Sequence, residues 1–141
     1  KFVMNDKCAA GTGRFLEMMA RTMEMSLDDM GKAGLSYKED ITISSMCTVF
    51  AESEVVSLIA QNKATDDIVH GLNKAVASKT AALAKRVGGE ERYMMTAGVS
   101  KNQGLVKTLE EKLGTTLVIS DKAQLCGALG AALFAKDMVI E

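Results

Sequence analysis

The sequence contains no proline and no tryptophan, and His70 is its only histidine. His70 has no plausible nucleophile to serve, so the sequence offers no Ser–His–Asp triad and no catalytic residue is predicted. A net charge of −1 gives no electrostatic case for binding nucleic acid or an acidic membrane. No apolar run approaches the roughly 20 residues that span a bilayer, and Lys1-Phe2-Val3 is not followed by the apolar core of a signal peptide. We therefore expect a cytoplasmic protein without membrane or nucleic-acid partners.

Cysteine is scarce, with Cys8, Cys47 and Cys126 far apart in the chain. An odd, widely spaced set is a poor disulfide framework and suits a reducing compartment. Cys8 and Cys47 each precede a predicted helix, where a thiolate is favoured, whereas Cys126 lies among apolar residues and is expected in the core. Buried free cysteine is the plain alternative for the first two. Two thiolates do not complete a zinc site or an iron–sulfur cluster, but a symmetric dimer can supply four.

The 141 residues suffice for one domain, and the pattern of apolar residues predicts alternating strands and helices. Helices are expected from Thr12 to about Met25, from a Ser26 cap, from a Thr48 cap, over 65–87, over 103–113 and over 122–138. The helix over 65–87 is expected to be capped by Thr65-Asp66-Asp67 and ended by Gly88-Gly89, and Gly114 is expected to end the helix over 103–113. Short strands are expected at 2–4, 41–43, 93–96 and 117–119. In the helix capped by Thr48, the predicted buried stripe consists of Phe50, Val55, Leu58 and Ile59. This order favours an α/β sheet with helices packed on it.

Two glycine-containing turns follow predicted strands. Gly11-Thr12-Gly13 opens the first helix, where backbone N–H groups and the helix N-terminus can face a phosphate or a sulfur ligand. The second turn is Ala97-Gly98-Val99-Ser100-Lys101-Asn102. Either turn alone is weak evidence, and no Gly-Lys-Ser/Thr of a Walker loop follows the first. Together they predict a nucleotide crevice. Glu52 and Glu54 follow Cys47 without an obvious partner.

Several stretches resemble one family, the 2-hydroxyacyl-CoA dehydratase activators, which are related to the ATPase subunits of benzoyl-CoA reductase. Residues 2–17, with Asn5-Asp6-Lys7-Cys8-Ala9-Ala10-Gly11-Thr12-Gly13, resemble the family's cluster-binding stretch, and residues 47–55 resemble its second cysteine stretch. Residues 97–102 are similar to its adenosine motif, and residues 127–133 to its closing helix. The first two motifs are specific, whereas the last two occur in many actin-like ATPases.

The resemblance implies the acetate-kinase/actin/Hsp70-like fold, in which two RNase-H-like domains close on ATP. Residues 1–141 are then a single domain, the C-terminal cluster- and nucleotide-binding half, with the N-terminal domain absent from this chain. The implied cofactors are ATP or ADP with Mg²⁺, and a 4Fe–4S cluster shared between two subunits through Cys8 and Cys47. The nucleotide-binding residues carried over are Gly11, Thr12, Gly13, Gly98, Val99, Ser100 and Asn102.

The implied activity is ATP-coupled transfer of one electron to a 2-hydroxyacyl-CoA dehydratase by a homodimer. Ferredoxin or flavodoxin is the implied electron donor. One residue departs from the family pattern, because Ala97 stands where a glycine pair usually begins. Without the first domain and its phosphate-binding hairpin, this half alone is expected to be inactive. The alternatives from the residues are a cluster-free, kinase-like ATPase domain of the same superfamily and a structural dimerisation module.

Overall fold

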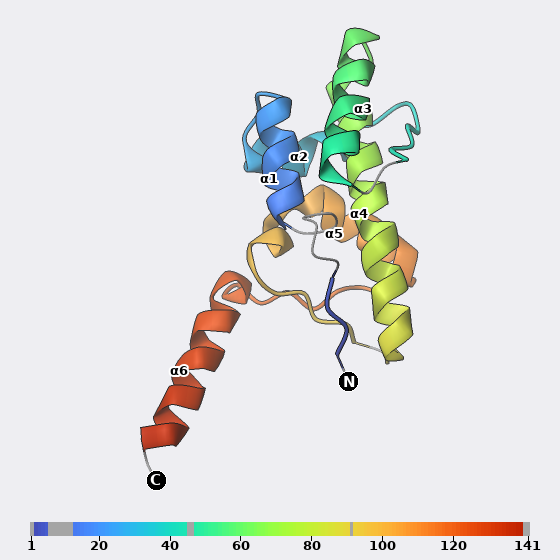
Figure 1. Ribbon diagram of the computed structural model, residues 1–141. Coiled ribbons are helices and arrows are strands. Elements are labelled where there is room, and N and C mark those ends of the chain that lie inside the picture. The colour runs from blue at the N-terminus through green and yellow to red at the C-terminus, as the bar shows by residue number, and fades with distance from the viewer. Residues whose placement is uncertain (1, 6–12, 45–46, 91, 140–141) are drawn as a thin grey trace.

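The helices lie close to their predicted positions. A computed structural model describes residues 2–5, 13–44, 47–90 and 92–139 of the chain (Figure 1). The described helices, in chain order, are α1 (Gly13–Thr22), α2 (Leu27–Ala33), α3 (Thr48–Ala60), α4 (Thr65–Val87), the 3₁₀ turn η1 (Gly98–Lys101), α5 (Gln103–Leu113), the 3₁₀ turn η2 (Ala123–Leu125) and α6 (Cys126–Val139).

Local sequence signals set several helix ends as expected. Ser26 caps α2, because its Oγ accepts the N–H of Asp29 at 3.0 Å. Gly88 and Gly114, with φ of 77° and 72°, end α4 and α5 in the left-handed conformation that favours glycine. The end of α1 is an exception, since the helix stops at Thr22 rather than near Met25. Its apolar spacing continues past Thr22, but the backbone does not remain helical.

Two predicted N-caps are wrong by one residue. Cys47, not Thr48, is the extended residue that precedes α3, and Ala64, not Thr65, precedes α4. Neither forms a side-chain capping bond. Asp67 does not cap α4 but accepts the backbone N–H groups of Lys38 and Glu39 at 2.7 and 3.0 Å. The capping preference of Asp67 is therefore overridden here by a tertiary contact.

The predicted strands do not form a sheet of full strands among the described residues. Among the described residues, the β-structure is one parallel bridge between Met94 and Val118, within the predicted strands 93–96 and 117–119. Met95 N–H donates to Val118 O at 3.0 Å, and Val118 N–H donates to Tyr93 O at 2.9 Å. Residues 41–43 and 2–4 form no strand in this part of the chain. A short β-branched run becomes a strand only when a neighbour pairs with it, and the sequence pattern does not show that neighbour.

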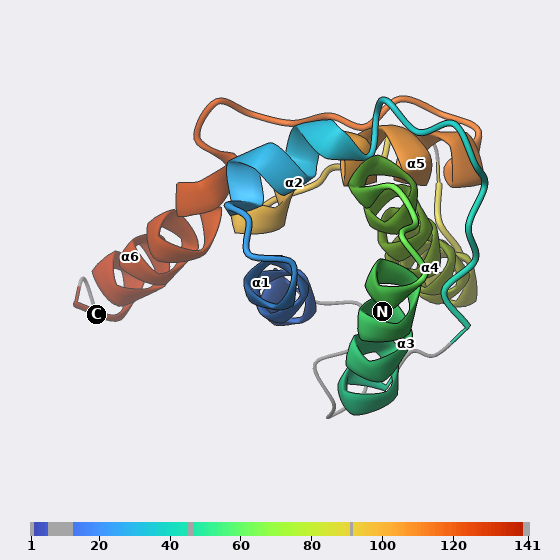
Figure 2. The ribbon, with the colours of Figure 1, turned by 90° about the horizontal axis from the view of Figure 1, so that it is seen from above.

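The core lies between α4 and the helices around it (Figures 1 and 2). α4 contributes more fully buried side chains than any other helix, and α1, α2, α3 and α5 pack on it or on one another. Ile41 and Ile43 are buried although they form no strand, and a Cβ on Gly71 would lie 2.9 Å from the carbonyl oxygen of Ile41. Alternating apolar residues in 41–43 therefore still mark core positions.

The face of α3 that is buried differs from the predicted stripe. Val55 is buried and Leu58 partly buried, but Phe50 and Ile59 are 67% and 43% exposed. The buried positions are Thr48, Ala51 and Val55, which share another side of the helix. Periodicity alone could not choose between these faces, because α3 is apolar on most of its surface.

α6 extends away from the other helices (Figure 1), and none of its residues is buried. Its exposed apolar side chains include Leu129, Leu133 and Phe134. Cys126 is half-buried at the first position of this helix, so its prediction as a core residue within the helix is wrong. None of the described helices is long and apolar enough to cross a membrane.

Candidate functional site

A cleft of about 540 Å³ lies where the beginning of α1 meets the 97–102 turn. Gly13, Gly98, Val99 and Asn102, all predicted to bind nucleotide, line it. Ser100 belongs to the same turn but is buried, and its hydroxyl donates to Ala97 O at 2.7 Å. Clefts of about 300–1,000 Å³ are typical of small-molecule sites. The structure thus brings Gly13, the described residue of the first glycine turn, together with the second turn at one concave surface.

Gly13 allows the two turns to approach closely. A Cβ at this position would lie 2.8 Å from Val99 Cγ2, closer than side chains pack. Gly98 is different, because no atom lies within 4 Å of the Cβ position that a side chain would occupy there. Gly13 therefore permits close contact between α1 and η1, while Gly98 leaves open space beside the cleft.

Ala97 has a backbone conformation that L-residues rarely adopt. Its φ is 69° and its ψ is −175°, a combination found almost only in glycine. The residue is held there by its N–H, which donates to Ala123 O at 2.8 Å, and by its carbonyl, which accepts the Ser100 hydroxyl. Asn102 supports the other end of the turn, since its Oδ1 accepts Leu105 N–H at 2.8 Å and caps α5. The turn is thus fixed at both ends by hydrogen bonds.

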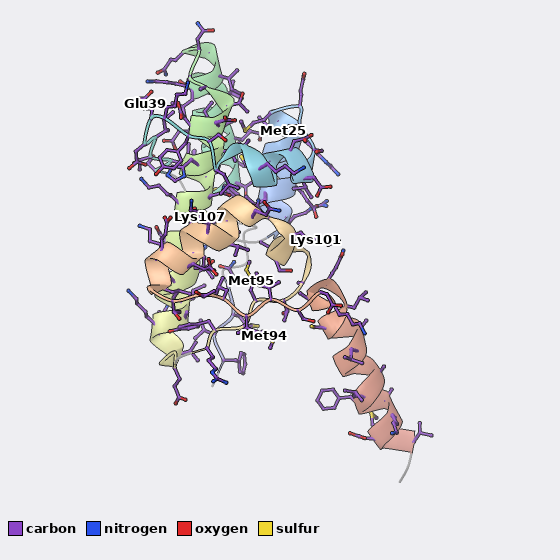
Figure 3. The ribbon with its side chains drawn as sticks, turned by 180° about the vertical axis from the view of Figure 1, so that it is seen from behind. Met25, Glu39, Met94, Met95, Lys101 and Lys107 are labelled. Atoms are coloured by element: carbon purple, nitrogen blue, oxygen red, sulfur yellow. The ribbon has the colours of Figure 1, made fainter. Side chains whose placement is uncertain are left out.

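Charged side chains of both signs surround the cleft. Arg14 and Lys101 carry positive charge, and Lys101 projects from η1 (Figure 3). Arg14 forms an exposed ion pair with Glu17 at 2.8 Å, whereas Lys101 pairs with no carboxylate among the described residues. A lysine without such a carboxylate partner, beside the N-terminus of a ten-residue helix, makes this end of the cleft favourable for an anion.

Sequence reasoning left part of the lining unassigned. Besides the predicted residues, the cleft is lined by Arg14, Leu16, Glu17, Leu27, Asp28, Ala97, Lys101 and Gln124. Arg14 directly follows the first glycine turn, and Lys101 lies within the second. The charge of these two residues could therefore have marked them in the sequence as lining residues. Asp28 and Gln124 come from α2 and η2, and nothing in their local sequence places them near the glycine turns.

Cys47 is the predicted metal ligand that the structure places. It is exposed and occupies the N-cap position of α3, where the first N–H groups of the helix have no partner within the helix. Thr48, the next residue, is buried and its Oγ1 has no hydrogen-bond partner among the described residues. Helix N–H groups that have no acceptor within the helix, next to an exposed cysteine, suit a thiolate or a cluster sulfur. Cys8, Gly11 and Thr12 lie outside the described residues, as do 6–12 as a whole.

A solved structure shows the class of protein to which this arrangement belongs. The chain superimposes on the activator of 2-hydroxyisocaproyl-CoA dehydratase from Clostridium difficile with bound ADPNP, with a TM-score of 0.91 and 44% identity. The match covers 98% of this chain and 52% of the activator chain. The chain thus has the fold of an actin-like ATPase, as the resemblance predicted.

The family follows from the sequence comparison. Residues 1–135 match the BadF/BadG/BcrA/BcrD ATPase family, and the chain belongs to this family. It is 45% identical over 136 residues to the 2-hydroxyisocaproyl-CoA dehydratase activator of Clostridioides difficile, covering 96% of this chain and 51% of the relative. It is 48% identical over 134 residues to the (R)-2-hydroxyglutaryl-CoA dehydratase activating ATPase of Acidaminococcus fermentans, covering 95% and 52%. The chain therefore spans about half the length of these curated relatives.

Proposed function

We propose that this chain is the C-terminal half of an ATP-driven activator that passes one electron to a 2-hydroxyacyl-CoA dehydratase. The observation that carries the proposal is the cleft between α1 and the 97–102 turn, in a chain of an ATPase family. Relatives of similar sequence are named as dehydratase activators. The remaining half of the ATP site belongs, in this proposal, to an N-terminal domain, so the present chain alone is inactive.

In this proposal, different described residues contact the phosphates and the nucleoside. The N-terminus of α1 at Gly13, with Lys101 nearby, provides positive potential for phosphate oxygens. The open space beside Gly98 allows the nucleoside to lie against the backbone. Gly11 and Thr12 are proposed to continue the phosphate-binding turn, and Mg²⁺ to accompany the phosphates. Ser100 acts indirectly, by holding Ala97 in its place.

Cys8 and Cys47 are proposed to hold one 4Fe–4S cluster between two subunits of a homodimer. When bound, such a cluster supplies storage and transfer of a single electron at low potential. The exposure of Cys47, its place at the N-terminus of α3 and the unpartnered hydroxyl of Thr48 support this role. Ferredoxin or flavodoxin is the proposed donor, and the dehydratase the acceptor.

α1 offers a mechanical link between the two sites. Its first residue, Gly13, lines the cleft and lies five positions after Cys8 in the chain. Phosphate contacts that shift the beginning of α1 would therefore also shift the proposed cluster ligand. If ATP analogues left the cluster potential of the intact protein unchanged, this coupling would be refuted.

The deciding experiment is an anaerobic iron and sulfide assay with an absorption spectrum after reconstitution. We expect about four iron atoms per dimer in the wild type, and loss of iron in both Cys8→Ser and Cys47→Ser. Cys126→Ser is the matched control and should retain the iron, because Cys126 lies in α6 and forms a contact with Lys122 O.

Iron that is absent from the wild type, or retained in Cys47→Ser, would contradict the cluster. Titration with ADP and Mg²⁺ then separates the alternatives. Binding that Lys101→Ala weakens would support a cluster-free, kinase-like ATPase domain. If the protein bound neither iron nor ADP, the structural dimerisation module would be the remaining alternative.

A further inference from the structure

Two carboxylates of α3, Glu52 and Glu54, connect this helix to two different parts of the chain. Residues two apart on a helix lie on different sides of it, since each step turns about 100°. Glu52 accepts a hydrogen bond from Thr22 in α1, and Glu54 accepts several from Ser44. Cys47, the proposed cluster ligand, is the N-cap of the same helix.

Glu54 fixes the chain that enters α3. Both of its carboxylate oxygens lie 3.1 Å from the backbone nitrogen of Ser44, and the Ser44 hydroxyl lies 3.1 and 3.3 Å from the same two oxygens. Hydrogen bonds to an ionised carboxylate are stronger than those between neutral groups. Ser44 precedes Cys47 by three residues in the sequence, and this contact ties Ser44 to the helix of which Cys47 is the N-cap.

Glu52 connects α3 to the helix that begins in the cleft. Its Oε1 lies 3.0 Å from Thr22 Oγ1, which also lies 3.2 Å from Met18 O. The single hydroxyl proton is shared between these acceptors, and the carboxylate is the stronger of the two. Because Thr22 is the last residue of α1, the contact joins the far end of that helix to the first turns of α3.

Apolar packing holds α3 only along one narrow side. Its buried residues are Thr48, Ala51 and Val55, while Val49, Phe50 and Val56 are more than half exposed. A helix with so few buried apolar side chains depends more on polar contacts for its orientation. The two carboxylates thus supply directional contacts that help to orient α3.

We infer that Glu52 and Glu54 are positioning residues for Cys47, holding its thiol in place from two sides of α3. The inference rests on the proposed role of Cys47 as a cluster ligand. Neither carboxylate is a ligand or a catalytic residue in this proposal. They act by holding α3 in place, so they affect where the thiol lies and do not themselves bind the cluster.

The first test measures thiol reactivity without the cluster. In a Cys8→Ser/Cys126→Ser background, Cys47 is the only cysteine, and its rate of alkylation by iodoacetamide reports its surroundings. We expect Glu54→Ala and Glu52→Ala each to raise the rate roughly twofold to tenfold, the range that one or two lost hydrogen bonds correspond to. Glu54→Gln keeps an acceptor oxygen for Ser44 and should restore most of the wild-type rate. Glu111→Ala, on the exposed side of α5, is the control and should change nothing.

The second test uses the chain with all three cysteines, reconstituted anaerobically. We expect Glu54→Ala to alter the electron paramagnetic resonance spectrum of the reduced cluster, or to lower the iron content by at least half, while Glu54→Gln behaves as the wild type. Unchanged alkylation rates and spectra in both alanine variants, with only a lower melting temperature, would overturn the inference and leave a purely structural role. If the wild type holds no iron, the proposed function fails, but the alkylation rates still decide whether the carboxylates position Cys47.

Discussion

At the scale of single residues, Ala97 is the least expected feature of the cleft. Its φ of 69° and ψ of −175° fall in a region that costs a non-glycine residue about 1–3 kcal/mol. The sequence identified Ala97 only as a departure from a glycine pattern. The structure shows that the departure places a methyl group on a strained backbone at the rim of the site.

Replacing this residue by glycine should stabilise the protein. Relief of the strain exceeds the extra entropy that glycine brings to the unfolded chain, so Ala97→Gly is expected to raise the free energy of unfolding by about 1 kcal/mol. Urea denaturation measures the change. Ala82→Gly, at an exposed position of α4, is the control and should destabilise by a similar amount. If Ala97→Gly lowered the free energy of unfolding as much as Ala82→Gly does, Ala97 would not be strained.

Gly13 provides a second prediction at this scale. In Gly13→Ala the new methyl would meet Val99 Cγ2 at 2.8 Å, so the Val99 side chain or the turn that carries it has to shift. We expect ADP affinity, measured by titration calorimetry, to fall about tenfold, as a loss of 1.4 kcal/mol implies. Adding Val99→Ala should restore much of the affinity, because it removes the clashing methyl. A double variant no better than Gly13→Ala would place the defect elsewhere.

At the scale of elements, the segment 35–44 is docked on α4 by charged contacts. Asp67 accepts the N–H groups of Lys38 and Glu39, Lys63 pairs with Glu39 at 2.7 Å, and Lys74 hydrogen-bonds Asp40. Figure 3 shows Glu39 on the outer side of this segment. The ring of His70 stacks on Tyr37 with centroids 3.4 Å apart. The only histidine therefore serves packing, which agrees with its lack of any predicted chemical role.

These contacts predict how stability depends on pH. The N–H groups of Glu39 and then Lys38 lower the pKa of Asp67 below its ordinary value of 3.8. A lowered folded-state pKa means that Asp67 contributes stability above about pH 4, and that this contribution is lost as the pH falls through the folded-state value. Asp67→Asn should therefore be less stable at pH 7 and lose less stability below pH 4 than the wild type.

Thermal unfolding from pH 7 to pH 2.5 measures this difference. Asp66→Asn is the adjacent control, because Asp66 accepts no hydrogen bond from residues 35–44 in the described part of the chain. Parallel pH curves for the wild type and Asp67→Asn would contradict the assignment. Lys74 lowers the pKa of Asp40 by a hydrogen bond, and the pH-dependent stability that Asp40 contributes should remain in both the wild type and Asp67→Asn.

At the scale of the whole molecule, α6 differs from the other helices. It has no buried residue, whereas α4 buries ten, and it contains Gly127 and Gly130, which lower helix propensity. We expect the amides of α6 to exchange with deuterium on the order of 100-fold faster than those of residues 67–77, since local opening there exposes little further surface. Exchange followed by mass spectrometry measures this. If the amides of α6 were as protected as those of residues 67–77, and lost this protection when the protein was diluted, α6 would instead pack on a second copy of the chain.

The sequence by itself determined the local features of this protein. Apolar spacing, the Ser26 cap and the glycines at 88 and 114 placed the helices, because these signals act over one or two turns. The motifs around residues 2–17 and 97–102 predicted the family, which the comparisons confirm. Gly13 and Gly98 were named as site residues from the two glycine turns together with the family resemblance, and both line the cleft.

The tertiary structure decided what depends on neighbours distant in the chain. It placed Asp28 and Gln124 at the cleft, turned Phe50 outward, and gave Glu52 and Glu54 their partners in α1 and at Ser44. It also reduced the predicted strands 93–96 and 117–119 to a single bridge among the described residues. The reason is the same in each case: burial, strand pairing and side-chain contacts are made between segments whose approach no local pattern encodes.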